Sequence, residues 1–121
     1  MLKSDFLIIG SGIGGLSYAL KVADQGRVVI ITKKGDCESS TNYAQGGIAG
    51  VLGVDDSKEA HVIDTLSAGD GICHEDVVRL VVDEGPGIIR QLIEWGCRFT
   101  LDSSGALSLG REGGHTASAP H

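Results

Sequence analysis

The stretch DFLIIGSGIGGLSYAL at residues 5–20 constrains the fold most, because it places a short apolar run directly before regularly spaced glycines. Runs like FLII are typical of strands buried on both faces. The residues after the glycines repeat at the spacing of one helix face: Leu16, Ala19, Leu20 and Ala23. A second β-branched run follows at Val28–Ile31. Residues 5–32 therefore predict two parallel strands joined by a helix in a right-handed crossover.

The glycines of this stretch match the spacing G-x-G-x-x-G through Gly10, Gly12 and Gly15. Glycine is frequent, with 19 among 121 residues, so the position of the match is stronger evidence than the spacing. In dinucleotide sites the strand leads into the turn, the second glycine admits the pyrophosphate, and the third lets the helix pack closely. The helix N-terminus adds free N–H groups and a partial positive charge. We therefore predict dinucleotide binding, with a purely structural tight turn as the alternative.

The end of the second strand lacks the acidic residue that usually holds the ribose hydroxyls of a bound dinucleotide. Thr32 and Lys33 stand there, followed by Lys34, and the acids Asp36 and Glu38 come a few residues later. A lysine at this place can meet a 2′-phosphate. An NADP-dependent reductase therefore remains an alternative.

Composition excludes several classes of partner. The formal net charge of −6 leaves no basic surface for a phosphate backbone, so we expect no nucleic acid. The apolar runs are far shorter than the ~20 residues that span a bilayer, and the first residues lack a secretory apolar region. We expect a cytoplasmic protein with no membrane contact. Cys37, Cys73 and Cys97 are widely spaced, which predicts reduced, mostly buried thiols and no metal site.

The rest of the chain predicts a loop, three helices and a β-hairpin. Residues 33–53 are dense in Gly, Ser, Thr and Asn, which indicates an ordered loop. Asp56 and Glu59 resemble a capping box that opens a helix ending near Ala68.

Apolar spacing predicts a second helix over residues 77–82, which the EGPG sequence at 84–87 ends. Pro86 is suited to the first turn of a third helix, and Gly96 follows the last apolar residues of that helix. Alternating apolar residues on both sides of DSSG predict a hairpin over residues 97–109.

The segment ESSTNYAQGGIAG, residues 38–50, resembles a signature of the succinate dehydrogenase and fumarate reductase flavoprotein family. In that family a Ser-Lys or similar pair replaces the acidic ribose ligand, and Thr32-Lys33 fits that variant. Respiratory members carry a histidine between a serine and a threonine, where the flavin attaches covalently. This chain has Ser40 at that place, and a serine hydroxyl there forms only hydrogen bonds, so the resemblance implies noncovalent FAD.

Together with HVIDTLSAGDGIC and REGGH, this segment is similar to the members that oxidise L-aspartate to iminosuccinate, and the likeness runs from Phe6 to His121. The resemblance implies the first step of quinolinate synthesis for NAD, with oxygen or fumarate as the electron acceptor and quinolinate synthase as a partner. A fumarate reductase or succinate dehydrogenase type of flavoprotein remains an alternative. A noncatalytic nucleotide-binding or subunit-interaction module is a further alternative, beside these flavoproteins and the NADP-dependent reductase.

The glycine pattern and the resemblance together predict one set of FAD-binding residues: Gly10, Ser11, Gly12, Ile13, Gly14, Gly15, Thr32, Lys33, Ser40, Thr41, Asn42, Tyr43, Ala44, Gln45, Gly46 and Gly47. Glu112 of REGGH aligns with a family glutamate that orients the substrate amino group, and a carboxylate facing an ammonium is electrostatically favourable. The alternative for Glu112 is an ion pair with Arg111 or another surface cation. His115 and His121 are weaker candidates for general bases.

The expected fold is α/β: a Rossmann-like FAD-binding unit followed by helices and a hairpin. We expect residues 1–121 to be the amino-terminal part of a larger FAD-binding domain, because family members are several times longer. The resemblance places their substrate-binding histidine and arginines in a later capping domain. These 121 residues alone are therefore expected not to turn over aspartate.

Overall fold

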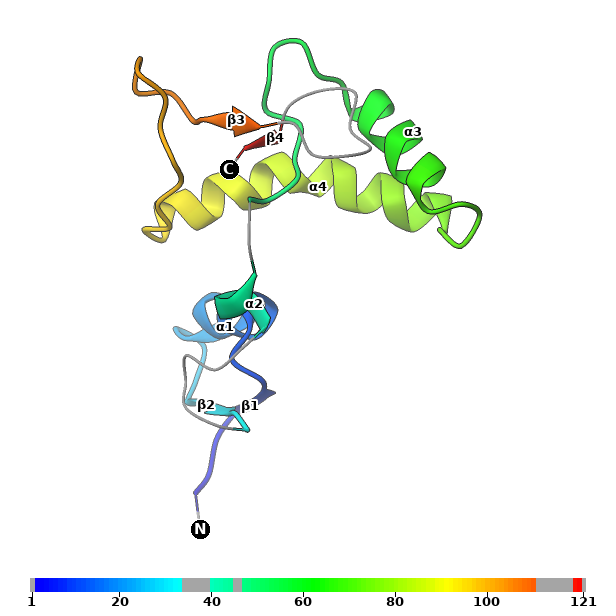
Figure 1. The fold of residues 1–121 in the computed structure, drawn as a ribbon. Coiled ribbons are helices and arrows are strands. Elements are labelled where there is room, and N and C mark those ends of the chain that lie inside the picture. Colours follow the sequence, from blue (N-terminus) through cyan, green and yellow to red (C-terminus); the bar gives the residue numbers. More distant parts are fainter. Residues whose placement is uncertain (1, 34–39, 45–46, 111–118, 121) are drawn as a thin grey trace. The chain divides into compact units, whose positions relative to one another are not determined.

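The computed structural model describes residues 2–33, 40–44, 47–110 and 119–120 (Figure 1). The chain forms two compact units, residues 1–45 and residues 46–121. The first unit contains β1 (Phe6–Ile9), α1 (Ile13–Val22), β2 (Val28–Ile31) and α2 (Ser40–Tyr43). The second unit contains α3 (Lys58–Ala68), α4 (Glu75–Glu94), β3 (Leu109–Gly110) and β4 (Ala119–Pro120).

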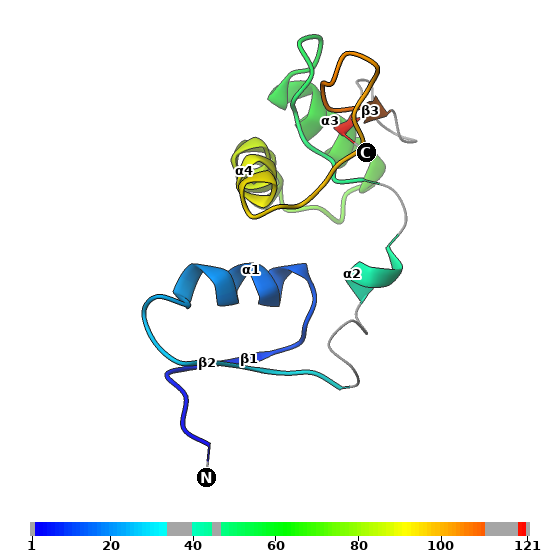
Figure 2. The same ribbon diagram turned by 90° about the vertical axis from the view of Figure 1, so that its left-hand side faces the viewer.

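The first unit is built on a parallel strand pair. β1 and β2 pair so that Phe6 lies opposite Val28. α1 connects the two strands and lies over one face of the pair (Figure 2). The crossover is fastened at its return, where the backbone N–H of Arg27 donates to Asp5 Oδ2 at 2.7 Å. These features confirm the predicted strand–helix–strand unit and the α/β class.

The apolar run FLII predicts a strand buried on both faces, but β1 is buried on one face only. Ile8 is buried, whereas its neighbours Leu7 and Ile9 are 57% and 83% exposed. Successive side chains of a strand point to opposite faces of the sheet. Within this unit α1 covers one face, so alternate side chains of β1 stay exposed.

The apolar stripe predicted for the first helix is not the face of α1 that packs on the strands. Leu16 and Leu20 are exposed, and Val22 is the buried apolar residue of α1. Gly15 turns toward the strands because its missing side chain allows the closest approach there. That contact fixes the rotation of the helix and leaves the predicted leucine stripe on the outside.

The second unit has a small core between α3 and α4, which lie side by side (Figure 1). Its most buried side chains are Val62 of α3 and Val82, Ile89 and Leu92 of α4. Gly50 is also buried, and a Cβ at that position would collide with Ile89 Cδ1. Among the described residues, no helix is long and apolar enough to cross a membrane.

The predicted capping box of α3 is wrong by one residue. The N-cap is Ser57, whose Oγ accepts from the Ala60 N–H at 3.1 Å. A cap side chain accepts from the second or third helical N–H, which Ser57 reaches and Asp56 does not. Asp56 instead accepts from the Ser57 N–H at 2.7 Å. The helix ends at Ala68, as predicted.

The two helices predicted on either side of EGPG are one continuous helix. α4 runs through 20 residues with Pro86 inside it. Proline removes one intrahelical hydrogen bond and costs roughly 3 kcal/mol in a helix interior. Pro86 is itself buried, and Val82 and Ile89 continue the same buried stripe on both sides of it. Burial of each such side chain contributes about 1.5–3 kcal/mol, so packing outweighs the local preference for a break.

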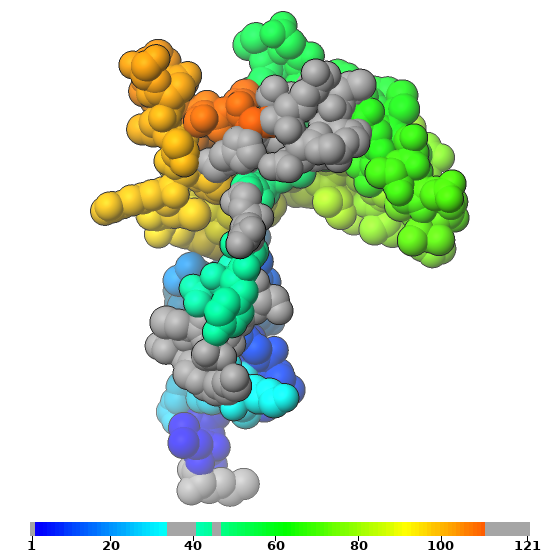
Figure 3. Space-filling view, in the orientation of Figure 1, coloured from blue at the N-terminus to red at the C-terminus, as the bar shows by residue number. Residues whose placement is uncertain are grey.

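The predicted hairpin is shorter than expected. Leu101 and Leu107 form a single antiparallel bridge, and Leu109 pairs instead with Pro120 of β4. Asp102 Oδ1 accepts hydrogen bonds from the backbone N–H and the hydroxyl of Ser104, which lower the pKa of the Asp102 carboxyl. The turn projects from the unit as orange atoms in Figure 3. The segment is therefore held both by these contacts of the Asp102 side chain and by backbone hydrogen bonds across the turn, from the Asp102 N–H to Ala106 and from the Ser108 N–H to Thr100, each at 2.8 Å.

Two smaller predictions also change. The segment predicted as a loop contains one helical turn, α2. Cys97 is exposed and Cys73 is half-buried, so the described thiols are less buried than predicted. Cys37 lies outside the described residues.

Candidate functional site

The glycine turn leaves β1 abruptly. The Gly10 N–H donates to the Ile31 carbonyl at 2.7 Å, which extends the β1–β2 pairing by one residue. Gly10 then takes φ of 105°, a conformation that residues with a side chain rarely adopt. The chain therefore turns away from the sheet immediately after that hydrogen bond.

The first turn of α1 is pressed against this glycine turn. A Cβ at Gly15 would collide with the Gly10 carbonyl oxygen and lie 3.2 Å from Ile8 Cγ2. A Cβ at Gly14 would meet nothing within 4 Å. The close-packing role predicted for the third glycine is thus specific to Gly15.

The N-terminus of α1 has no acidic side chain in its first turn and no capping side chain of its own. Gly12 is the N-cap, without a side chain to bond the helix, and no acidic residue lies in the first turn. The first N–H groups of a helix have no intrahelical acceptor, and their end of the helix is partially positive. The N–H groups of Gly14 and Gly15 at this end are suited to an anion such as a diphosphate.

Thr41 joins the second predicted segment to this helix end. The Ile13 N–H donates to Thr41 Oγ1 at 3.0 Å, across 28 residues of sequence. The same Oγ1 lies 3.4 Å from the position that a Cβ on Gly12 would take. This placement agrees with the expectation that the serine- and glycine-rich segment approaches the glycine turn. α2 is therefore fastened beside the start of α1.

A second hydroxyl contact joins the turn to the end of β2. Ser11 is the buried polar side chain of the described part of the chain, at 7% exposure. Its Oγ lies 3.2 Å from Oγ1 of Thr32, the first residue after β2. The Ser11 hydroxyl thus points toward the end of β2. Lys33, the next residue, is exposed.

The structure describes only some of the remaining predicted site residues. Asn42, Tyr43 and Ala44 are exposed at the end of α2 and just beyond it, and Gly47 belongs to the second unit. Gln45, Gly46 and Glu112 lie outside the described residues, as do the candidate bases His115 and His121. The structure gives Ser40 only as the first residue of α2.

Sequence reasoning missed the two hydroxyl contacts. The carboxyl ends of adjacent parallel strands meet at one edge of the sheet, so the residues just beyond β1 and β2 are neighbours. Ser11 and Thr32 stand two and one residues beyond their strands. Two hydroxyl residues at those places are the signal that identifies the first contact. No spacing in the sequence announces that Thr41 bonds Ile13.

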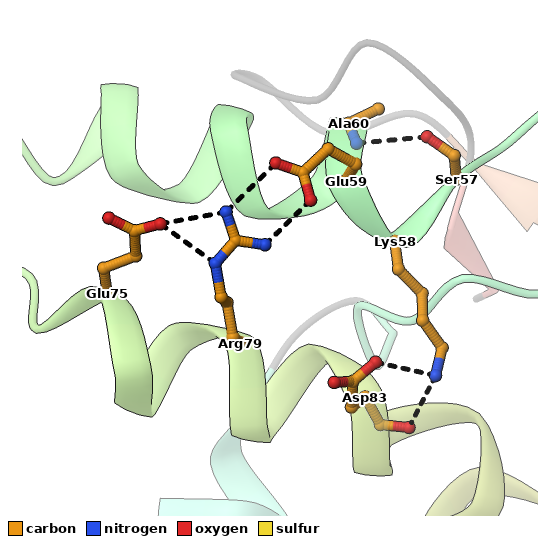
Figure 4. A network of polar contacts seen from close by, with 7 residues as sticks. All are labelled: Ser57, Lys58, Glu59, Ala60, Glu75, Arg79 and Asp83. Atoms are coloured by element: carbon orange, nitrogen blue, oxygen red, sulfur yellow. Dashed lines mark hydrogen bonds and ion pairs between the residues drawn. The ribbon is translucent and has the colours of Figure 1, made fainter.

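A second polar cluster joins α3 to α4 (Figure 4). Arg79 donates to Glu59 at 2.7 and 3.0 Å and to Glu75 at 2.9 Å. The hydrogen bonds and charge of Arg79 lower the pKa of Glu59, and hydrogen bonds from Arg79 to Glu59 and Glu75 raise the pKa of Arg79. Lys58 also pairs with Asp83 at 2.8 Å.

The charged side chains of this cluster form ion pairs with one another at the surface. We therefore interpret the cluster as a structural link between α3 and α4 and not as a catalytic group. Within the described residues, no group of three or more histidine, cysteine, aspartate or glutamate side chains is placed to hold a metal ion.

Comparison with known proteins identifies a family to which this chain is similar. A model of the FAD binding domain family matches residues 5–121. Chloroplastic L-aspartate oxidase of Arabidopsis thaliana is 54% identical over 112 residues, covering 93% of this chain and 17% of the relative. L-aspartate oxidase of Streptomyces coelicolor is 45% identical over 115 residues, covering 94% of this chain and 20% of the relative.

A solved structure is similar along nearly the whole chain. E. coli quinol fumarate reductase FrdA matches with a TM-score of 0.90 at 33% identity, covering 98% of this chain and 21% of that chain. The chain spans about a fifth of the length of the curated relatives and the structure it matches.

Proposed function

Because the chain belongs to the FAD binding domain family, we propose that it holds FAD for the oxidation of L-aspartate to iminosuccinate. The observation that carries the proposal is the hydrogen bond from the Ile13 N–H to Thr41. It brings the segment with the family resemblance to the helix end that is suited to a diphosphate. The identity to proteins named L-aspartate oxidase supports the substrate.

The described residues fit a dinucleotide. Gly10, with its positive φ, begins the turn. The close contact between Gly15 and Gly10 places the first N–H groups of α1 beside this turn. In the proposal, the N–H groups of Gly12, Gly14 and Gly15 bind the diphosphate, since the Ile13 N–H donates to Thr41. Lys33 lies on the ribose side. Thr41 and the residues after it in the first unit, Asn42 to Ala44, lie along the rest of the cofactor. No acidic side chain in the first turn of α1 opposes an anion there.

FAD, when bound, supplies the hydride acceptor that oxidation of an amine to an imine requires. The chain has to keep the substrate carbon beside that acceptor and to balance the substrate's charges. We propose that Glu112 orients the substrate ammonium, because opposite charges at close range attract most strongly where water is excluded. The amine and its carbon lose two electrons, which pass to oxygen or fumarate.

The attachment of FAD is proposed to be noncovalent. A serine, Ser40, stands where the respiratory relatives have the histidine that bonds the flavin. We further propose that the imino product passes to quinolinate synthase and that the protein works in the cytoplasm.

A fumarate reductase or succinate dehydrogenase type of reaction is the second candidate. The similarity to E. coli quinol fumarate reductase FrdA, with its TM-score of 0.90, favours it. The identity of 33% to that protein is lower than the 45% and 54% to the two aspartate oxidases, which favours the first candidate. The NADP-dependent alternative loses its support because the family model describes FAD.

The test is purification of the full-length protein followed by cofactor and substrate assays. We expect a yellow protein that releases FAD on denaturation, and hydrogen peroxide formation that depends on L-aspartate and not on succinate. Oxidation of succinate without oxidation of aspartate would support the second candidate instead. Binding of NADPH with no affinity for FAD would overturn both.

A further inference from the structure

We propose that Ser11 and Thr32 form a positioning pair, whose hydrogen bond fixes the glycine turn against the end of β2. In this view the Ser11 hydroxyl does not contact the cofactor, although the sequence analysis includes Ser11 among the predicted FAD-binding residues. The inference rests on the proposed FAD site and deepens it. It assigns a structural cause for the spacing between the diphosphate and ribose ends of that site.

The burial of Ser11 is the first support. Its side chain is 7% exposed, and the hydroxyl oxygen of Thr32 lies 3.2 Å from its own. Buried polar groups in proteins nearly always have a hydrogen-bond partner, and leaving one unpaired is costly. In the proposal Ser11 donates its one hydroxyl proton to Thr32 Oγ1, so that no donor of its side chain remains for a phosphate. The phosphate contact at this turn therefore falls to backbone N–H groups.

The position of the pair is the second support. The backbone pairing of β1 with β2 ends at the hydrogen bond from Gly10 to Ile31, because Gly10 then turns the chain away. Ser11 and Thr32 follow directly, so their side chains continue the link where the backbones separate. Among the described residues, this side-chain contact is the one that follows the end of the backbone pairing.

The two ends of the cofactor site lie immediately beyond this link. Gly12 follows Ser11 and begins the helix N-terminus that the proposal assigns to the diphosphate. Lys33 follows Thr32 and is exposed on the ribose side. Breaking the hydroxyl bond frees these two residues to separate. The expected consequence is weaker binding of any ligand that spans both.

The test uses a double-mutant cycle in the full-length protein. Ser11→Ala and Thr32→Val each remove one hydroxyl, and Thr32→Ser keeps it. The exposed Ser4→Ala is the matched control. Dissociation constants for FAD come from quenching of flavin fluorescence, and those for ADP, which contains both the diphosphate and the ribose, come from calorimetry. Circular dichroism and urea unfolding are recorded for every variant without ligand.

For a positioning pair, each single variant raises the dissociation constants for FAD and ADP by about three- to tenfold, the effect of one neutral hydrogen bond. The double variant is no weaker than the worse single variant, because both changes remove the same bond. Thr32→Ser and Ser4→Ala bind as the wild type does. Thr32→Val nearly conserves side-chain volume, so the comparison of Thr32→Val with Thr32→Ser stands even where Ser11→Ala unfolds.

Three results would overturn the inference. Folded variants that bind FAD as tightly as the wild type would reduce the pair to a contribution to stability. A loss of affinity in Ser11→Ala without one in Thr32→Val would mean that Ser11 contacts the cofactor itself. Additive losses in the double variant would mean two separate contacts. Failure of the wild type to bind FAD would instead refute the proposed function, which keeps the two failures distinct.

Discussion

Replacing Gly15 by alanine tests the contact between α1 and the glycine turn. A Cβ there meets the Gly10 carbonyl oxygen, a backbone atom that has no rotamer to change, and lies 3.2 Å from Ile8 Cγ2. Overpacking of this kind costs about 1–3 kcal/mol. Against this, alanine is favoured over glycine inside a helix by about 1 kcal/mol. The net expectation for Gly15→Ala is a loss of about 0–2 kcal/mol of unfolding free energy.

Gly14→Ala is the matched control, because it is the neighbouring residue of the same helix. A Cβ at Gly14 meets nothing within 4 Å. Only the helix preference acts there, so we expect a gain of about 0.5–1 kcal/mol. The two alanine variants should therefore differ by about 1–3 kcal/mol, since the clash is the only term they do not share.

The assay is urea unfolding of both variants without FAD, followed by circular dichroism. The midpoint should move down or stay level for Gly15→Ala and move up for Gly14→Ala. Equal stabilisation by both substitutions would refute the close-packing argument. We also expect Gly15→Ala to bind FAD more weakly, because the displaced helix start carries the N–H groups assigned to the diphosphate.

Three further predictions follow from particular contacts. Thr41→Val leaves the Ile13 N–H without its acceptor and should raise the FAD dissociation constant about threefold or more, whereas Thr41→Ser should not; equal binding by Thr41→Val would contradict the anchoring role. Arg79→Gln should make the free energy of unfolding depend less steeply on pH in the acidic range. Because Arg79 lowers the pKa of Glu59 in the folded chain, the pair stabilises the fold above the ordinary carboxyl value of 4.5. That stabilisation disappears as the pH falls through the lowered value, so a urea series across this range should show a steeper loss in the wild type than in Arg79→Gln. Pro86→Ala should stabilise α4 by about 1–2 kcal/mol, since the restored hydrogen bond and helix preference exceed the lost packing, and a lower unfolding midpoint would show that the buried ring matters more.

The sequence predicts secondary structure best where the residues that determine an element lie within or beside that element. Residues 5–32 carry strand, turn, helix and strand in a row, and the structure confirms that order. The pairing of Phe6 with Val28 needs only a short crossover. The role of Gly15 likewise follows from the spacing of the glycines.

Predictions failed where packing at a distance overrode local preference. Pro86 and its neighbouring glycines indicate a break, but burial of Val82 and Ile89 on one stripe keeps α4 continuous. The face of α1 was misassigned because the rotation of the helix is set by one close contact rather than by its leucines. The bond between Thr41 and Ile13 joins residues 28 apart, and no periodicity encodes it.

The most direct measurement of the central claim is an NMR titration of the ¹⁵N-labelled chain with FAD, which detects weak binding residue by residue. Binding of the diphosphate at the glycine turn predicts that the amide signals of Gly12, Gly14 and Gly15 shift first and furthest, while those of Val82 and its neighbours in α4 stay unmoved. Shifts confined to residues 47–110, with the signals of residues 10–15 unchanged at saturating FAD, would contradict it.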